Sequence, residues 1–130
     1  MKEIEQIVNT ILNTTPLSEE ERFRFKTAYL SHTLIDMRAF FDWSDKTSFQ
    51  RQVLRALLRI PPGETRSYQQ IAATIGHPRA MRAVGTTCAQ NRYPLIIPCH
   101  RVVKSDGSFG NYLWGFDVKY KLINFERHKY

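Results

Sequence analysis

Two helix-start patterns constrain the fold of this chain more than any other feature of its sequence. Thr47 and Gln50 form a capping box, in which each side chain satisfies a backbone N–H left free in the first helical turn. Ser67 and Gln70 repeat the pattern. The first predicts an amphipathic helix that ends at the Pro-Pro-Gly of residues 61–63, and the second predicts a short helix over residues 68–75. The inward side of the first helix is expected to hold Phe49, Val53, Ala56, Leu57 and Ile60.

Gly76, His77 and Pro78 then form a tight turn into another helix, expected over residues 79–90. Two short helices joined by a glycine-containing turn resemble a helix-turn-helix. Helical spacing separates the second helix into a face of small residues with two arginines and a more apolar face. The first face holds Arg79, Arg82, Gly85, Thr86 and Ala89, and the second holds Ala80, Val84, Thr87 and Cys88. Small residues allow close approach of a partner, although a solvated face without long side chains is the alternative.

Residues 1–45 form a separate helical segment in which the sequence shows no chemistry of its own. Apolar residues recur at helical spacing from Ile4 to Ile11, and the run breaks at residues 13–16. Ser18 is expected to cap a second helix that continues toward Phe40, with three glutamates at its positive N-terminal end. We therefore expect a helical N-terminal appendage, residues 1–45, and a second domain, residues 46–130. The expected fold class is mainly α: a compact helical domain with a helix-turn-helix and a short extended segment, preceded by the appendage.

The charge balance allows a polyanionic partner without requiring one. Nineteen Lys and Arg against twelve Asp and Glu give a net charge of +7. An excess of Lys and Arg favours binding to phosphates, because the cations condensed on a polyanion are released when it binds. An ordinary basic protein has the same composition. The hydrophobic content of 42% is sufficient for a core. No signal peptide or membrane-spanning run is visible, so the chain is expected in the cytoplasm, or in the nucleus of a eukaryote, without a membrane partner. We also expect it to be a monomer.

The two cysteines, Cys88 and Cys99, show neither a CxxC pair nor a Cys/His cluster at zinc spacing. We therefore expect no disulfide framework and no metal site. Cys88 falls on the same helix face as Val84 and is expected to be a small core residue. Cys99 follows a short apolar run, residues 95–97, that is expected to be extended and buried and that stops at Pro98.

Next to Cys99 stand His100 and Arg101. A thiol reacts as its thiolate, so an adjacent imidazole that takes the proton and a nearby positive charge both favour reactivity. By itself the pair fits a buried structural cysteine beside a surface histidine better than a reactive thiol.

The longer string decides between these readings. Residues 98–102, PCHRV, are similar to the active-site signature of the O6-alkylguanine-DNA alkyltransferase family. Further matching segments follow the family order: FQRQV at 49–53, IPPG at 60–63, SY at 67–68, RAVG at 82–85, Asn91, and GNY at 110–112. The resemblance covers residues 49–126. It implies that residues 46–130 form the DNA-binding and active-site domain and that the short extended segment before Cys99 is the active-site segment. It implies DNA repair in which an alkyl group moves irreversibly, once per molecule, from O6 of guanine or O4 of thymine in double-stranded DNA to the cysteine, without cofactor or metal.

The resemblance also implies a role for each residue of the reaction centre. Cys99 is the expected alkyl acceptor. His100, held on its far side by Glu126, is the expected base that deprotonates the thiol through a water molecule. Asn91 braces the turn that carries the site. Tyr68 donates a proton to the guanine as O6 departs.

The remaining expected roles concern DNA. Arg82 fills the gap when the damaged base swings out of the duplex from the minor-groove side, and Tyr112 covers the extruded base. The full set expected to contact DNA is Tyr68, Arg79, Arg82, Gly85, Thr86, Ala89 and Arg101. Tyr112, Leu113 and Trp114 are expected to line the base pocket. Many family members have a small residue and two glycines where this chain has Leu113-Trp114-Gly115, so we expect poor acceptance of large O6 groups such as benzyl.

Three other functions remain as alternatives. An alkyltransferase-like protein binds the lesion without transfer, but such proteins usually replace the cysteine that this chain keeps at residue 99. A helix-turn-helix regulator should present polar side chains to the major groove, whereas Gly85, Thr86 and Ala89 suit the minor groove better. A cysteine hydrolase needs an oxyanion hole, for which the sequence shows no motif. Family members usually carry an N-terminal domain with a β-sheet, and in some a zinc site, and neither is expected in the helical residues 1–45.

Overall fold

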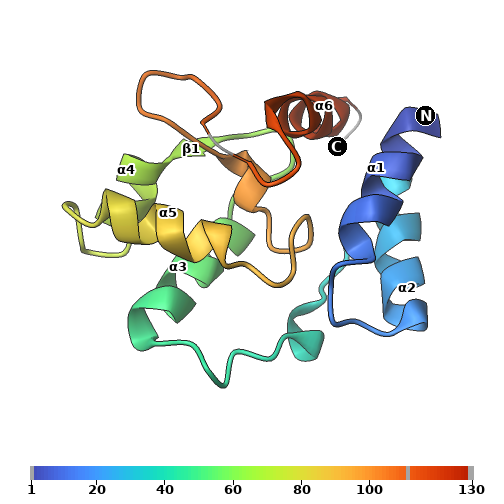
Figure 1. The fold of residues 1–130 in the computed structure, drawn as a ribbon, viewed down its shortest axis with the longest axis horizontal. Helices are drawn as coiled ribbons and strands as arrows, with labels where there is room; N and C mark the ends of the chain where they lie inside the picture. The colour runs from blue at the N-terminus through green and yellow to red at the C-terminus, as the bar shows by residue number, and fades with distance from the viewer. Residues whose placement is uncertain (1, 111, 129–130) are drawn as a thin grey trace.

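The computed structural model describes residues 2–110 and 112–128, and most of these residues lie in helices. The helices are α1 (Lys2–Leu12), α2 (Glu19–Leu30), α3 (Ser48–Leu58), α4 (Tyr68–Thr74), α5 (Met81–Ala89) and α6 (Phe116–Glu126). Two 3-10 turns, η1 (Arg38–Phe40) and η2 (Cys99–Arg101), and two short strands, β1 (Arg66–Ser67) and β2 (Val102–Val103), complete the fold (Figure 1). The mainly α class predicted from sequence is confirmed.

Both predicted capping boxes are present and start the helices that they predict. Thr47 Oγ1 accepts the backbone N–H of Gln50 at 3.1 Å, and Gln50 Oε1 accepts that of Thr47 at 2.9 Å. Ser67 and Gln70 make the same pair of bonds at the start of α4. Ser18 also caps α2, together with Glu21. These bonds fix three helix N-termini through local sequence alone.

The predicted continuation of α2 toward Phe40 is wrong, because α2 ends at Leu30. His32 takes a left-handed conformation with φ 56°, and the Thr33 N–H reaches back to the Ala28 carbonyl at 2.8 Å. This arrangement is a Schellman motif, which closes a helix by satisfying its last carbonyls. Glycine usually occupies the left-handed position, so no helix-stop signal is visible in this part of the sequence.

The apolar run before Cys99 is buried as predicted, but it is not extended. Leu95 has a φ of +74°, and the Ile97 N–H donates to the Tyr93 carbonyl at 2.8 Å, so the chain turns back on itself. The extended segment lies after the cysteine instead. There β2 pairs in parallel with β1, with Val102 opposite Arg66.

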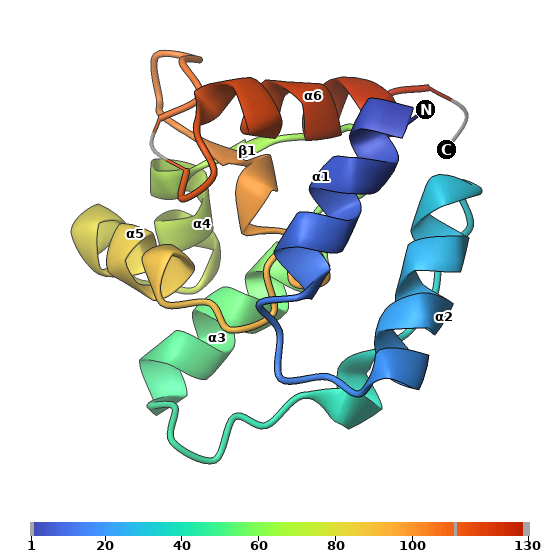
Figure 2. The same cartoon turned by 45° about the vertical axis from the view of Figure 1, so that its right-hand side comes forward.

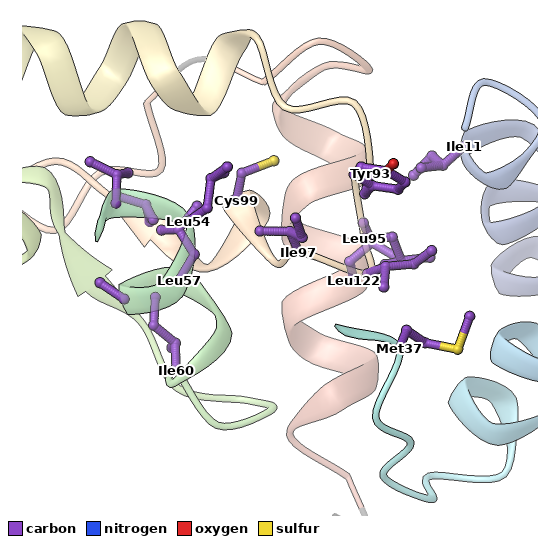
Figure 3. Packing of buried hydrophobic residues seen from close by; sticks show 14 of the residues in the cluster. Ile11, Met37, Leu54, Leu57, Ile60, Tyr93, Leu95, Ile97, Cys99 and Leu122 are labelled. Carbon is purple, nitrogen blue, oxygen red and sulfur yellow. The ribbon is translucent and has the colours of Figure 1, made fainter. Parts of the chain in front are cut away.

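One hydrophobic core joins the N-terminal segment, residues 2–45, to the rest of the described chain. Figures 1 and 2 show α1 and α2 on one side, α3, α4 and α5 on the other, and η2 with α6 between them. Figure 3 shows part of this core, with Ile11 and Met37 at one side and, at the other, Leu54 and Leu57 of α3 and the following Ile60. No helix in the described ranges is long and apolar enough to cross a membrane.

A cavity-forming substitution in α1 tests whether the N-terminal segment shares this core. Ile11 is fully buried, so Ile11→Ala should lower the free energy of unfolding of the whole chain by about 2–5 kcal/mol, in a single transition. Urea unfolding followed by fluorescence and circular dichroism measures this. Gln6→Ala, an exposed change on the same helix, should have little effect. A separate early transition for the Ile11 variant would show that the segment folds independently.

Candidate active site

Cys99 is the first residue of η2, and the turn before it leaves its side chain almost fully buried, 8% exposed. Burial raises the pKa of the Cys99 thiol, whereas a hydrogen bond from the Asn91 side chain and the positive charge of Lys119 act in the opposite direction. The thiol therefore needs a base to react at neutral pH.

Asn91 braces the turn that leads to this thiol. Its amide nitrogen donates to the Ile97 carbonyl at 2.8 Å, and its carbonyl oxygen accepts the backbone N–H two residues further on at 3.0 Å. These two bonds hold the turn that precedes Cys99.

His100 and Glu126 form a buried pair beside the thiol. His100 Nε2 lies 2.6 Å from Glu126 Oε2, and neither side chain is exposed. Burial would raise the pKa of Glu126, but the charges and hydrogen bonds of His100 and Arg101 outweigh it and hold that pKa well below its usual range. Burial lowers the pKa of His100, although Glu126 opposes this.

A proton on Nε2 then faces an ionised carboxylate, so the neutral imidazole has its lone pair on Nδ1. Nδ1 is buried and makes no hydrogen bond to the described protein atoms. The pair is therefore arranged so that the second ring nitrogen can act as a base.

Arg101 requires a correction, because it was expected to contact DNA. Its side chain is buried, its Nε donates to Glu126 Oε1 at 2.7 Å, and its terminal nitrogen donates to the Ile60 carbonyl at 2.7 Å. A buried guanidinium needs such partners, and here they join η2 to α6 and to the end of α3. Arg101 therefore organises the interior of the site.

Two further donors reach Glu126, and one of them was not anticipated from sequence. The Gly63 N–H lies 3.3 Å from Oε1, and the Tyr29 hydroxyl donates to Oε2 at 2.7 Å. Tyr29 belongs to α2, in the segment that showed no chemistry in its sequence. A tyrosine on a helix is usually explained by core packing, so no sequence signal marked it.

Lys119 is the second residue that sequence reasoning missed. It is fully buried on α6, and its ammonium donates to the Phe109 carbonyl and lies 6.0 Å from the centre of the Tyr112 ring. Burial lowers the pKa of Lys119 to about 8, although Cys99 and Cys88 act in the opposite direction. Lysine on a helix is usually solvated, so only the tertiary structure shows this one near the thiol.

Tyr68 stands at the first turn of α4, half-buried, with its ring between two glycines. A Cβ added to Gly85 of α5 would lie 3.9 Å from this ring, and one added to Gly110 would lie 3.7 Å from it. Burial raises the pKa of Tyr68 to about 12, with contributions from Cys88 and Cys99. The hydroxyl consequently stays protonated at neutral pH.

The helix-turn-helix consists of α4, a turn and α5, and α5 begins two residues later than predicted. Arg79 is therefore an exposed residue of the turn rather than of the helix. Arg82, Thr86 and Ala89 are exposed on α5, and Gly85 is half-buried beside Tyr68. Cys88, expected in the core, is also half-buried.

The segment expected to cover the base pocket is only partly packed. Tyr112 lies with its ring centre 6.5 Å from that of His100 and 5.6 Å from that of Trp114. Leu113 was expected in the pocket but is 82% exposed. Asn111, part of the matching GNY string, lies outside the described residues. The described part of the chain contains no group of three or more His, Cys, Asp or Glu side chains that could hold a metal ion.

These features define a helix-turn-helix protein with a buried thiol set beside a buried acid–base pair. Residues 48–128 match the family model described as "6-O-methylguanine DNA methyltransferase, DNA binding domain". Because that match spans more than half of the chain, the protein belongs to this family.

Curated relatives agree with this assignment. The regulatory protein ada of Salmonella typhimurium is 53% identical over 64% of this chain and 24% of its own length. The methylated-DNA–protein-cysteine methyltransferase of Methanosarcina barkeri is 50% identical over 63% of this chain and 52% of its own length. The human protein of the same name is 52% identical over 63% of this chain and 40% of its own length. The chain thus spans about half, or less, of the relatives it matches.

Solved structures extend the likeness. Mycobacterium tuberculosis OGT in complex with DNA superposes with a TM-score of 0.61 at 47% identity, over 62% of this chain and 49% of the other. The O6-methylguanine-DNA methyltransferase of Pyrococcus kodakaraensis superposes with a TM-score of 0.70 over 96% of this chain and 75% of the other, at 22% identity. The second match shows a shared fold that reaches into the N-terminal segment.

Neutralising the central carboxylate should destabilise the chain. Glu126→Gln leaves the buried Arg101 without its ionic partner, and we expect a loss of about 3–5 kcal/mol in the free energy of unfolding. Urea unfolding at neutral pH measures it. Glu64→Gln removes an exposed ion pair with Arg66 at 3.1 Å and should cost about 0–1 kcal/mol. Equal unfolding midpoints for the two variants would contradict this account of the buried pair.

Proposed function

We propose that this chain repairs alkylated double-stranded DNA by transferring an alkyl group from O6 of guanine to Cys99. The observation that carries the proposal is the buried Cys99 thiol next to the His100–Glu126 pair, in a chain of this family. M. tuberculosis OGT, to which this chain is similar, has been solved in complex with DNA. In this proposal the protein acts as a monomer and needs no cofactor.

The proposed reaction begins with proton removal. His100 Nδ1 takes the thiol proton through a bridging water, and the ionised Glu126 stabilises the imidazolium. The thiolate then attacks the alkyl carbon, forming the S–C bond as the C–O6 bond breaks. Tyr68 supplies a proton to the departing guanine and is reprotonated by solvent. The thioether cannot be reversed by these groups, so each molecule reacts once.

Base flipping follows from the burial of the sulfur. A base within a stacked duplex cannot reach a side chain that is only 8% exposed, so the alkylated nucleotide leaves the stack. Arg82, exposed on α5, fills the gap, and the small residues Gly85, Thr86 and Ala89 allow the helix to approach the minor groove. Tyr112 and Trp114 cover the extruded base. O4 of thymine has the same leaving-group chemistry and is proposed as a second substrate.

Mass spectrometry of the intact protein tests the reaction. After incubation with duplex DNA carrying O6-methylguanine, we expect a stable gain of one methyl group that maps to Cys99. Cys99→Ala should show no gain, and Cys88→Ala, which changes the other thiol, should still show it. Tight binding without any gain in mass would favour the alternative function, a lesion-binding protein without transfer activity.

The bulk of Trp114 leads to a prediction about substrate size. Trp114 is half-buried against Tyr112, so a benzyl group on O6 should meet it while a methyl group should not. Trp114→Gly should raise the rate with free O6-benzylguanine by about tenfold or more, and change the rate with O6-methylguanine much less. Rapid-quench assays of the two free bases measure this. Comparable rates with both bases in the unmodified protein would refute it.

A further inference from the structure

The Tyr29 hydroxyl shares an oxygen with the proposed catalytic base. It donates to Glu126 Oε2 at 2.7 Å, and the same oxygen lies 2.6 Å from His100 Nε2. The other carboxylate oxygen is occupied by Arg101 and the Gly63 N–H. Tyr29 therefore bonds to the oxygen that faces the imidazole, and it is the donor that comes from outside the family-model match of residues 48–128.

Ring packing fixes the direction of this hydroxyl. Tyr29 is 3% exposed, with its ring centre 5.6 Å from that of Phe25 on α2 and 5.4 Å from that of Phe125 on α6. The phenol is thus packed against one ring of its own helix and one ring of α6. A side chain ordered in this way loses little entropy when it makes the bond.

We propose that Tyr29 is a positioning residue of the alkyl-transfer site, which holds Glu126 Oε2 in place and limits how strongly that carboxylate draws a proton onto His100. This inference rests on the function proposed above. A donor on the shared oxygen withdraws negative charge from it, so the imidazolium gains less from the carboxylate. The neutral imidazole, the form that can accept the thiol proton, consequently persists to lower pH.

Other charged and titratable groups also face this pair, and substitution of Tyr29 leaves them in place. Arg101 and Lys119 disfavour a positive charge on His100, as burial does. The titratable and charged side chains that face the pair are Tyr29 of α2, Cys99 and Arg101 of η2, Tyr112 of the following loop, and Lys119 of α6. His32, which follows α2, stacks on Phe125, the ring that packs against Tyr29.

Tyr29→Phe removes only the hydroxyl, and Tyr93→Phe provides a matched control. Tyr93 is also 3% exposed, and its hydroxyl accepts the Asp42 N–H at 2.8 Å, so it too links the N-terminal segment to the rest of the chain. It makes no bond to Glu126. Both variants should lose some stability, so each is assayed at a temperature at which unfolding curves show it fully folded.

The first readout is the single-turnover rate of methyl transfer from duplex DNA as a function of pH. His100 must be neutral to act, so the rate falls on the acidic side of the profile. In Tyr29→Phe, protonation of His100 becomes easier, and the midpoint of this acidic limb should move to higher pH by about half a unit. Tyr93→Phe should keep the original midpoint. An unchanged or lowered midpoint for Tyr29→Phe, or an equal shift in both variants, would overturn the proposal.

The second readout needs no activity. An NMR titration of the His100 imidazole in the protein alone should show its protonation at higher pH in Tyr29→Phe than in the unmodified chain. Identical titrations would refute the role of Tyr29 whatever the transfer assay shows. Failure of the unmodified protein to take up a methyl group would instead refute the proposed function, so the two failures are distinguishable.

Discussion

The buried carboxylate of Glu126 is the interaction on which the rest of the structure depends. A charge without solvent must be paired and fully hydrogen-bonded to be tolerated. Its four donors come from separate parts of the chain: Tyr29 of α2, Gly63 after α3, and His100 and Arg101 of η2. Satisfying this one group therefore requires α2, the end of α3, η2 and α6 to meet correctly.

The same requirement places the thiol. Arg101 donates both to Glu126 and to the Ile60 carbonyl, so η2 has a fixed position between α6 and α3. Cys99 begins that turn, and Asn91 holds the backbone that enters it. Burial makes the thiol less acidic, and the Asn91 side chain and the Lys119 charge oppose this without cancelling it. The thiol is thus sheltered from solvent next to a buried imidazole in the chain.

Local features of the fold could be predicted from the sequence, whereas tertiary pairings could not. The capping boxes at Thr47 and Ser67 are complete within four residues, so their helices start where predicted. The end of α2 depends on a left-handed His32, and the turn before the cysteine depends on a left-handed Leu95. Neither residue type by itself predicts that conformation.

The errors in the site have the same cause. Family resemblance indicated the positions of Cys99, His100 and Glu126, but Arg101 was read as a surface cation because arginine usually is one. Tyr29 was missed because its partner, Glu126, lies 97 residues away. Lys119 was missed because a lysine on a helix is usually solvated. Sequence periodicity identifies the face of a helix that is buried, but it does not identify the polar group on another segment that a buried side chain contacts.

The N-terminal segment shows how a part of the chain without a recognisable motif can still belong to the site. It lies outside the family-model match, yet the fold similarity to the P. kodakaraensis structure covers 96% of the chain. Ile11 and Met37 join the common core, and Tyr29 reaches the carboxylate through it. Apolar packing tolerates many sequences at similar volume, so the segment can lack motifs and keep its place. Its hydrogen bond to Glu126 is then specified by that packing, since the rings of Phe25 and Phe125 leave the Tyr29 hydroxyl directed at that carboxylate.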